Sequence, residues 1–488
     1  MRLHALPLLL TCILAGCSAF RNTERVPVGP PGARPAGTDS APDSTPAGAD
    51  DVPGSAAAPR VPIETRVLDN GLRVIVVRNP VVPLVTVELD VNNGAYTQTP
   101  EYEGLAHLYE HMLFKANAAI PNQERWLERT RELGIVWNGS TSAERVNYFV
   151  TLPRDNLRAG MEFMRDAIRH PLFDQAELER ERPVVLGEYD RNESNPAFAL
   201  SMSVDSLLWG PEYFSRKNVI GNREVIATTT REKMRTIQQR YYVPNNTALV
   251  LAGDLETEEA FDLAEEVFGD WPRAPDPFST YPIPPVPRLA ESKAVIVERP
   301  VNSVTVTLAW QGPSLARNRA ATYAADVLSA ALRLPDSGFQ KRLVDSGLAF
   351  NAGLSYASLA YTGPIRLTAQ TAPERVAALL RALEREIAAF DDPGYVTPEQ
   401  LAAAKKRIAV AEVYAREQPS QFAHALGFWW AVAGLQYYLG YVANVQNVDA
   451  QDLASYARTY IQEQPRVTGV LIAPADRERV GLVREGLL

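Results

Sequence analysis

Apolar and polar positions alternate along this chain in a way that predicts strands and helices in succession from about residue 63. Two β-type runs, 63–68 and 72–78, flank Asp69-Asn70-Gly71, a turn sequence typical of a hairpin. A third apolar run, 84–91, predicts another strand. Further segments have the 3.6-residue period of helices, and one apolar strand follows them; the helices are expected at 104–116, 123–133, 157–168 and 175–191, and the strand at 247–252.

The same succession returns in the second half of the chain. A helix, a Tyr and a short break precede an apolar strand at 247–252 and again at 467–472. The two tyrosines, Tyr242 and Tyr460, are 218 residues apart, which matches one domain length. We therefore predict an α+β fold made by tandem duplication. Two homologous α/β sandwich-like domains would each hold a mostly antiparallel sheet with helices packed on it.

Composition divides the chain further. Residues 272–287 hold seven prolines, so 272–290 is expected to be a linker between domains at 63–271 and 291–488. Residues 18–62 are rich in Pro, Ala and Gly and carry almost no large apolar side chains, which predicts a disordered tether. No segment after residue 17 has the length and apolarity of a membrane span.

Residues 1–17 resemble a bacterial lipoprotein signal peptide. A basic start is followed by a short apolar run that ends in Leu-Ala-Gly-Cys17. In such signals the Cys is lipidated and becomes the new N-terminus, and the lipid anchors the protein to a membrane. Ser18 follows the Cys, and by resemblance to the sorting rule of Gram-negative bacteria this favours the outer membrane, facing the periplasm. An ordinary cleaved secretory signal is the alternative.

Charge and cysteine content exclude several kinds of chemistry. The net charge of −9 removes the usual electrostatic argument for nucleic-acid binding. The two cysteines, Cys12 and Cys17, both lie in the signal, so the body has neither a disulfide framework nor cysteine-based metal or thiol chemistry. Any reaction must therefore use His, carboxylate and hydroxyl groups.

Two of the five histidines lie four residues apart, with a glutamate just before the second. On a helix His107 and His111 share a face and can reach one metal ion, and Glu110 lies on the same side. Five histidines in 488 residues would give only about 0.04 pairs at this spacing by chance. The alternative is a buried pair of core histidines, which would leave two imidazoles and a carboxylate in need of partners.

His-x-x-Glu-His is the inverted zinc-peptidase motif, and its flanks, Gly-Leu-Ala and Met-Leu-Phe-Lys, are similar to those of the pitrilysin, insulin-degrading enzyme and mitochondrial processing peptidase family. The resemblance implies one Zn²⁺ per chain, with His107, His111 and Glu188 as ligands and Glu110 as the catalytic base. It also implies that Glu181, seven residues before Glu188, orients a ligand from outside the metal's own shell. Pro183 between these glutamates is expected to kink the helix or to start a new one.

The same resemblance assigns a substrate strand and predicts a partner. Asn138, Ser140 and Tyr148 lie where the family has an edge strand that pairs with the substrate backbone. Single-chain members carry an Arg and a Tyr seven residues apart in the second half, but this chain has Leu343 and Phe350 there. Arg342 is one residue out of register and is expected to point elsewhere. A homologous subunit that carries the Arg/Tyr pair is therefore predicted.

These inferences favour a periplasmic zinc endopeptidase that cuts peptides or unfolded protein segments, as the metal-bearing subunit of a heterodimer. A maturation protease for one dedicated substrate differs from this only in specificity. The alternative from another class is a non-catalytic binding or assembly subunit with a structural zinc site. Retention of Glu110 favours the enzyme, because a structural site needs no base and is usually closed by a fourth ligand.

Overall fold

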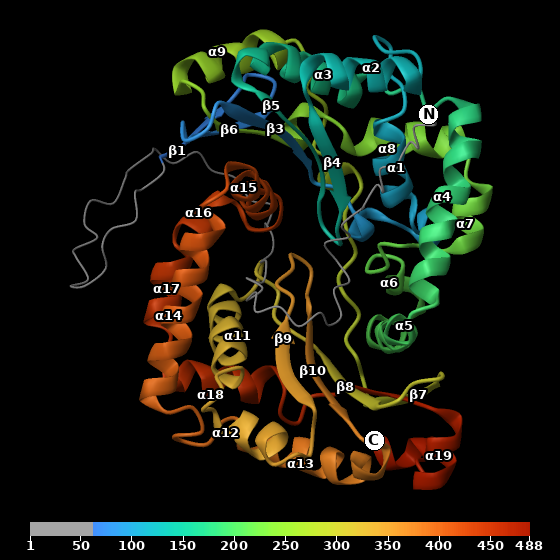
Figure 1. The fold of residues 1–488 in the computed structure, drawn as a ribbon, viewed down its shortest axis with the longest axis vertical. Coiled ribbons are helices and arrows are strands. Elements are labelled where there is room, and N and C mark those ends of the chain that lie inside the picture. Colours follow the sequence, from blue (N-terminus) through green and yellow to red (C-terminus); the bar gives the residue numbers. More distant parts are fainter. Residues whose placement is uncertain (1–61) are drawn as a thin grey trace, which may run out of the picture.

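The computed structural model describes residues 62–488; the predicted signal peptide, Cys17 and the tether up to residue 61 lie outside the described residues. Two sheets form two lobes that face each other, the first half above and the second below in Figure 1. The six strands of the first sheet have the order β1-β2-β6-β3-β5-β4. Their bounds are Ile63–Val67 (β1), Arg73–Arg78 (β2), Leu84–Val91 (β3), Val136–Thr141 (β4), Val146–Pro153 (β5) and Thr247–Gly253 (β6).

The second sheet repeats the first apart from β1. Its order is β7-β11-β8-β10-β9, and in each sheet the pair β2-β6 or β7-β11 is parallel while the remaining pairs are antiparallel. This confirms two homologous, mostly antiparallel sheets. The bounds are Lys293–Glu298 (β7), Val304–Gln311 (β8), Asn351–Tyr356 (β9), Pro364–Thr371 (β10) and Val467–Ile472 (β11).

The elements predicted from periodicity are present with shifts of a few residues at their ends. The turn after β1 closes with a 2.9 Å hydrogen bond from the Leu68 N–H to the Leu72 carbonyl. Every residue of β6 is buried, as expected for an apolar strand in the middle of a covered sheet. The main helices of the first half are Leu105–Leu113 (α1), Gln123–Leu133 (α2), Leu157–Arg169 (α3), Gln175–Glu193 (α4), Pro196–Trp209 (α5), Arg231–Tyr241 (α8) and Thr257–Phe268 (α9).

The second half also has helices packed around its sheet. Those used below are Arg319–Leu332 (α11), Val376–Ala389 (α13), Pro398–Ala415 (α14), Pro419–Ala433 (α15), Tyr441–Asn447 (α17) and Ala450–Tyr460 (α18). Within residues 62–488 none of the helices combines the length and the apolarity needed to cross a bilayer.

The two halves exchange one helix each. α5, which follows the long helix α4, packs on β7, β8 and β11 of the second sheet. α15, which follows the long helix α14, packs on β3 and β6 of the first sheet, so in Figure 1 it lies between the lobes. Each sheet therefore has a face covered by a helix from the other half, and the halves share apolar cores.

The contact between α15 and β3 is unusually polar. Glu88 and Asp90 alternate with buried apolar residues of β3 and are themselves fully buried. Glu88 bonds the ring of His424 on α15, and Arg145 donates to Asp90 (3.0 Å) and to the His424 carbonyl (2.9 Å). Gly427 lies against Asp90, where a Cβ would come within 1.8 Å of Oδ2. His424 thus has a structural role between the halves.

Candidate active site

α1 carries the sequence motif and presents it beneath the first sheet. The helix starts after Gly104, whose φ of 92° favours glycine, at a close approach of its backbone to Gly221. Leu105, Leu108 and Met112 are fully buried and form the apolar back of the helix. The opposite side is left for His107, Glu110 and His111.

α4 brings two glutamates to the histidines. It begins at Asp174, whose side chain accepts hydrogen bonds from the Ala176 and Glu177 N–H groups. Glu181, Val185 and Glu188 follow at helical spacing and are all buried. The expectation that Pro183 starts a new helix is wrong: α4 runs from 175 to 193 through it. Pro183 lies on the exposed side, so the carbonyl that loses its N–H partner can bond water.

Three side-chain atoms converge on one point. The Nε2 atoms of His107 and His111 are 3.2 Å apart, and Glu188 Oε2 lies 3.6 Å and 3.8 Å from them. A triangle of this size has a point about 2.1 Å from every corner, which is the length of Zn–N and Zn–O bonds. Glu188 Oε2 is also buried without a hydrogen-bond partner among the described residues. The group therefore fits a bound metal ion.

Glu181 orients one of these groups. Its Oε1 lies 2.9 Å from Nδ1 of His111, and Lys115 Nζ lies 2.6 Å from its Oε2. The carboxylate holds the Nδ1–H, which leaves Nε2 of His111 as the free lone pair that faces Glu188. The residue assigned by resemblance to a supporting role is thus placed where that role can be performed.

Protonation of the histidines follows from their surroundings. Burial, together with the neighbouring His111, lowers the pKa of His107 to about 3, so this imidazole is neutral and can act as a ligand. Burial also acts to lower the pKa of His111, but the hydrogen bond to Glu181 and the nearby carboxylates outweigh it, and the pKa is raised. An excess of negative charge around His111 is what a cation at this site would balance.

Glu110 is held by the edge strand. Thr141, the last residue of β4, donates a 2.7 Å hydrogen bond to its Oε2. Gly139 lies beside it, and a Cβ there would be only 3.0 Å from Glu110 Cγ. Burial raises the pKa of Glu110, while His111 and Thr141 oppose the rise. A half-buried carboxylate with a raised pKa beside a metal site suits proton transfer.

Of the three residues predicted for the substrate strand, two lie on the edge strand β4 and the third lies on its neighbour β5. β4 is the last strand of its sheet and pairs only with β5, so its other edge is open to an extended peptide. Asn138 and Ser140 are partly exposed on it and line the pocket described below. Tyr148 lies on β5 with its ring fully buried, and its hydroxyl bonds that of Tyr242 (2.7 Å). Its side chain therefore cannot touch a peptide on β4.

The second-half positions of the missing Arg/Tyr pair offer no donor. Leu343 is fully buried, and Phe350 is exposed but has no hydroxyl. Arg342 is bound to Glu386, with Nη2 2.8 Å from Oε2, so it is engaged elsewhere.

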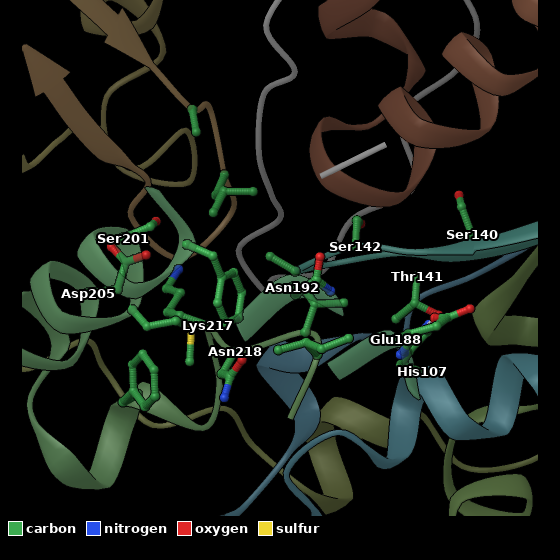
Figure 2. A pocket seen from close by; sticks show the side chains of 18 of the residues that line it. His107, Ser140, Thr141, Ser142, Glu188, Asn192, Ser201, Asp205, Lys217 and Asn218 are labelled. Carbon is green, nitrogen blue, oxygen red and sulfur yellow. The ribbon is translucent and has the colours of Figure 1, made fainter. Parts of the chain in front are cut away.

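A pocket of about 320 Å³ extends from the metal-site residues into the second half. One end is formed by His107, Glu188 and Thr141, and the other holds Asp205 and Lys217, as Figure 2 shows. Arg366 of β10 reaches this far end and bonds Asp205. Sequence reasoning missed Thr141, Lys217, Asp205 and Arg366. Of these, only Thr141 had a signal, because it lies in the segment already assigned to the substrate strand.

Comparisons with known proteins identify the family of the chain and its fold. Two family models match, "Insulinase (Peptidase family M16)" over residues 73–213 and "Peptidase M16 inactive domain" over 228–408. An uncharacterized zinc protease of Rickettsia felis is 22% identical over 422 residues, covering 84% of this chain and 97% of that protein.

Solved structures show the same fold. A protease from Helicobacter pylori superposes with a TM-score of 0.76 at 22% identity, covering 84% of this chain and all of that one. The periplasmic protease PqqL of Escherichia coli gives a TM-score of 0.70 at 19% identity, covering 88% of this chain and 50% of that one. With the inverted motif on α1 and the duplicated sheets, these matches show that the chain belongs to peptidase family M16, the pitrilysin family.

Proposed function

We propose that the chain is a zinc-dependent endopeptidase that binds one Zn²⁺ through His107, His111 and Glu188. The observation that carries this is the conjunction of a three-atom metal site with a half-buried carboxylate, Glu110, on the same helix face. Zinc bound there would supply a Lewis acid that activates water and polarises the scissile carbonyl.

The chain's own groups then account for proton transfer and binding. Thr141 occupies Oε2 of Glu110, so Oε1 is the atom that accepts the proton of the attacking water and passes it to the leaving amine. The open edge of β4 pairs with the substrate backbone, which selects extended peptides and unfolded segments with little demand on sequence. The pocket gives the substrate a lined space that extends toward the second half.

We further propose that a homologous subunit completes the site. The side chains of Leu343 and Phe350 have no hydrogen-bond donor and Arg342 is bound to Glu386, so we infer that another chain supplies donors for the oxyanion at these positions. Such a partner would carry the Arg/Tyr pair.

The location is proposed from the N-terminal sequence. Lipidated Cys17 would anchor the chain to the outer membrane, and residues 18–62 would hold the body in the periplasm. The similar fold of the periplasmic protease PqqL supports the periplasmic location, and the lipid anchor rests on the N-terminal sequence alone.

Hydrolysis of unstructured peptides by the full chain tests the proposal. We expect one zinc per chain, and we expect Glu110→Gln to retain zinc and lose cleavage. Exposed Glu179→Gln is the matched control, because it makes the same chemical change on α4 without touching the site. Peptide cleavage by the chain alone would contradict the proposal that a partner subunit completes the site. If the chain cleaves no peptide either alone or with an Arg/Tyr-bearing homologue, the result would favour a non-catalytic binding subunit.

A further inference from the structure

The hairpin that ends the edge strand is held by the second half of the chain. Glu144 lies in the turn between β4 and β5, and it is only 2% exposed. Its carboxylate accepts hydrogen bonds from the backbone N–H of Ala360 and from that of Tyr361 (3.0 Å to Oε1). Both donors belong to the loop 357–363 that joins β9 to β10. The turns of two equivalent hairpins, one from each half, therefore meet.

Lys217 makes the complementary contact with the same loop. Its Nζ donates to the carbonyls of Tyr361 (3.2 Å) and Thr362 (2.8 Å) and lies 4.0 Å from Glu144 Oε1. The side chain is 6% exposed and lies over the ring of Trp209, 4.8 Å from its centre. Glu144 of the first half thus accepts from two N–H groups of the second-half loop, and Lys217 donates to two of the loop's carbonyls.

The loop has a backbone shaped for this contact. Thr362 has a φ of 68°, a left-handed conformation that a β-branched residue rarely adopts. At Gly363 a Cβ would lie 1.4 Å from the Ala357 carbonyl oxygen, so only glycine fits the tight return of the chain. Ser314 donates a 2.7 Å hydrogen bond to the Ala360 carbonyl and holds the loop from behind. This geometry directs the loop's polar groups toward Glu144 and Lys217.

Both sides of the contact reach the site. Ala357, Leu359 and Lys217 line the pocket. Glu144 follows Thr141 by three residues, and Thr141 holds Glu110. The Tyr96 N–H bonds the Ala143 carbonyl (2.8 Å), and the Tyr96 ring packs on Tyr361, with centroids 5.6 Å apart. The end of β4 is therefore enclosed between the first-half body and the second-half loop.

We propose that Glu144 and Lys217 are positioning residues through which the second half holds the end of β4 in register with Glu110. Without them the loop 357–363 and residues 139–143 would move, and Thr141 would no longer keep the Glu110 carboxylate in place. The consequence for catalysis rests on the proposed peptidase function, whereas the consequence for the strand does not.

The test compares Glu144→Gln and Lys217→Met in the zinc-loaded full chain, assayed with whatever partner the wild type needs. The amide in Glu144→Gln keeps one acceptor and loses the charge beside Lys217, and Lys217→Met keeps the apolar stem. We expect kcat to fall about tenfold or more, with a smaller change in KM, because a small displacement of a catalytic group is costly. The double variant should lose no more than either single variant, since the two side chains act as one unit.

Hydrogen–deuterium exchange gives a readout that does not depend on activity. Both variants should exchange faster at amides 139–143 and 358–363, with zinc content as in the wild type. Glu256→Gln is the control, because it removes an exposed carboxylate from its pair with Arg78, outside the pocket-lining residues. Unchanged exchange at 139–143, or additive losses of kcat, would overturn the proposal. A wild type that is inactive both alone and with an Arg/Tyr-bearing homologue would refute the peptidase function, and the exchange data would still decide the role of Glu144 and Lys217.

Discussion

Thr141 donates a 2.7 Å hydrogen bond from Oγ1 to Oε2 of Glu110, and this bond joins the edge strand of the first sheet to the helix that carries the metal-site histidines. The strand that would bind substrate is thus linked directly to the carboxylate that would transfer the proton, so a shift of the strand would displace the carboxylate. Gly139 makes the approach possible, since a larger residue there would press on Glu110.

Thr141→Val should lower kcat about tenfold, because the valine keeps the volume but leaves the half-buried Glu110 carboxylate without its donor. Thr141→Ser restores the hydroxyl and should retain most of the activity. Steady-state kinetics on an unstructured peptide, with zinc content measured in parallel, checks this. Equal kcat values for the Val and Ser variants would contradict a role for the hydroxyl.

Metal affinity should separate the two glutamates of α4 that face the histidines, Glu181 and Glu188. Glu188→Gln replaces one of the three atoms at the site, so zinc should be lost almost completely. Glu181→Gln removes only the group that orients His111, which should weaken zinc binding about 10–100-fold. Competition with a chromophoric chelator measures both, and Glu179→Gln on the exposed side should match the wild type. Equal losses at 181 and 188 would show that Glu181 is itself a ligand.

Much of the site was predictable because its signals are local. Residues four and seven apart on a helix share a face, so the sequence alone places His107 with His111 and Glu181 with Glu188. Of the two outcomes expected at Pro183, the start of a new helix is wrong, because a proline on the exposed side of a helix costs a hydrogen bond that water can replace. The duplication of the sheet followed from the repeated pattern of a helix, a Tyr and a strand, whereas the order of the strands within each sheet was not predicted.

The remaining features depend on contacts between distant segments. Glu88 and Asp90 alternate with apolar residues as they would on a solvent-facing strand, yet α15 from the other half buries them. Tyr148 lies in the segment assigned to substrate, but its position within the sheet turns its ring into the core. Glu144 and Lys217 have partners more than 140 residues away, and those partners are backbone groups, which carry no residue-type signal.

Gly427→Ala should destabilise the chain by about 1–3 kcal/mol, because the added methyl overlaps the carboxylate of Asp90 and forces α15 away from β3. Gly187→Ala is the matched control. It also replaces a glycine inside a helix, but nothing lies within 4 Å of its Cβ position, so it should stabilise by up to about 1 kcal/mol. Urea unfolding of both variants provides the comparison. Equal effects would show that α15 can shift without cost.

The pH dependence of stability should depend on Asp326, which lies on α11, 219 residues after His107, and so takes nearly the same place in the second repeat. Burial raises its pKa to about 7, although the Tyr441 hydroxyl donates a 2.7 Å hydrogen bond to it. Between about pH 4 and pH 7 the folded chain therefore holds a proton that the unfolded chain has released. The stabilisation that comes from this bound proton is complete below pH 4 and disappears as the pH rises to 7.

Urea unfolding at pH 4.5, 5.5 and 7.5 tests this. As the pH rises, Asp326→Asn should lose less stability than the wild type. Asp392→Asn, at an exposed position of the same half, is the control and should lose as much stability as the wild type. Parallel curves for Asp326→Asn and the wild type would mean that the folded chain does not hold this proton.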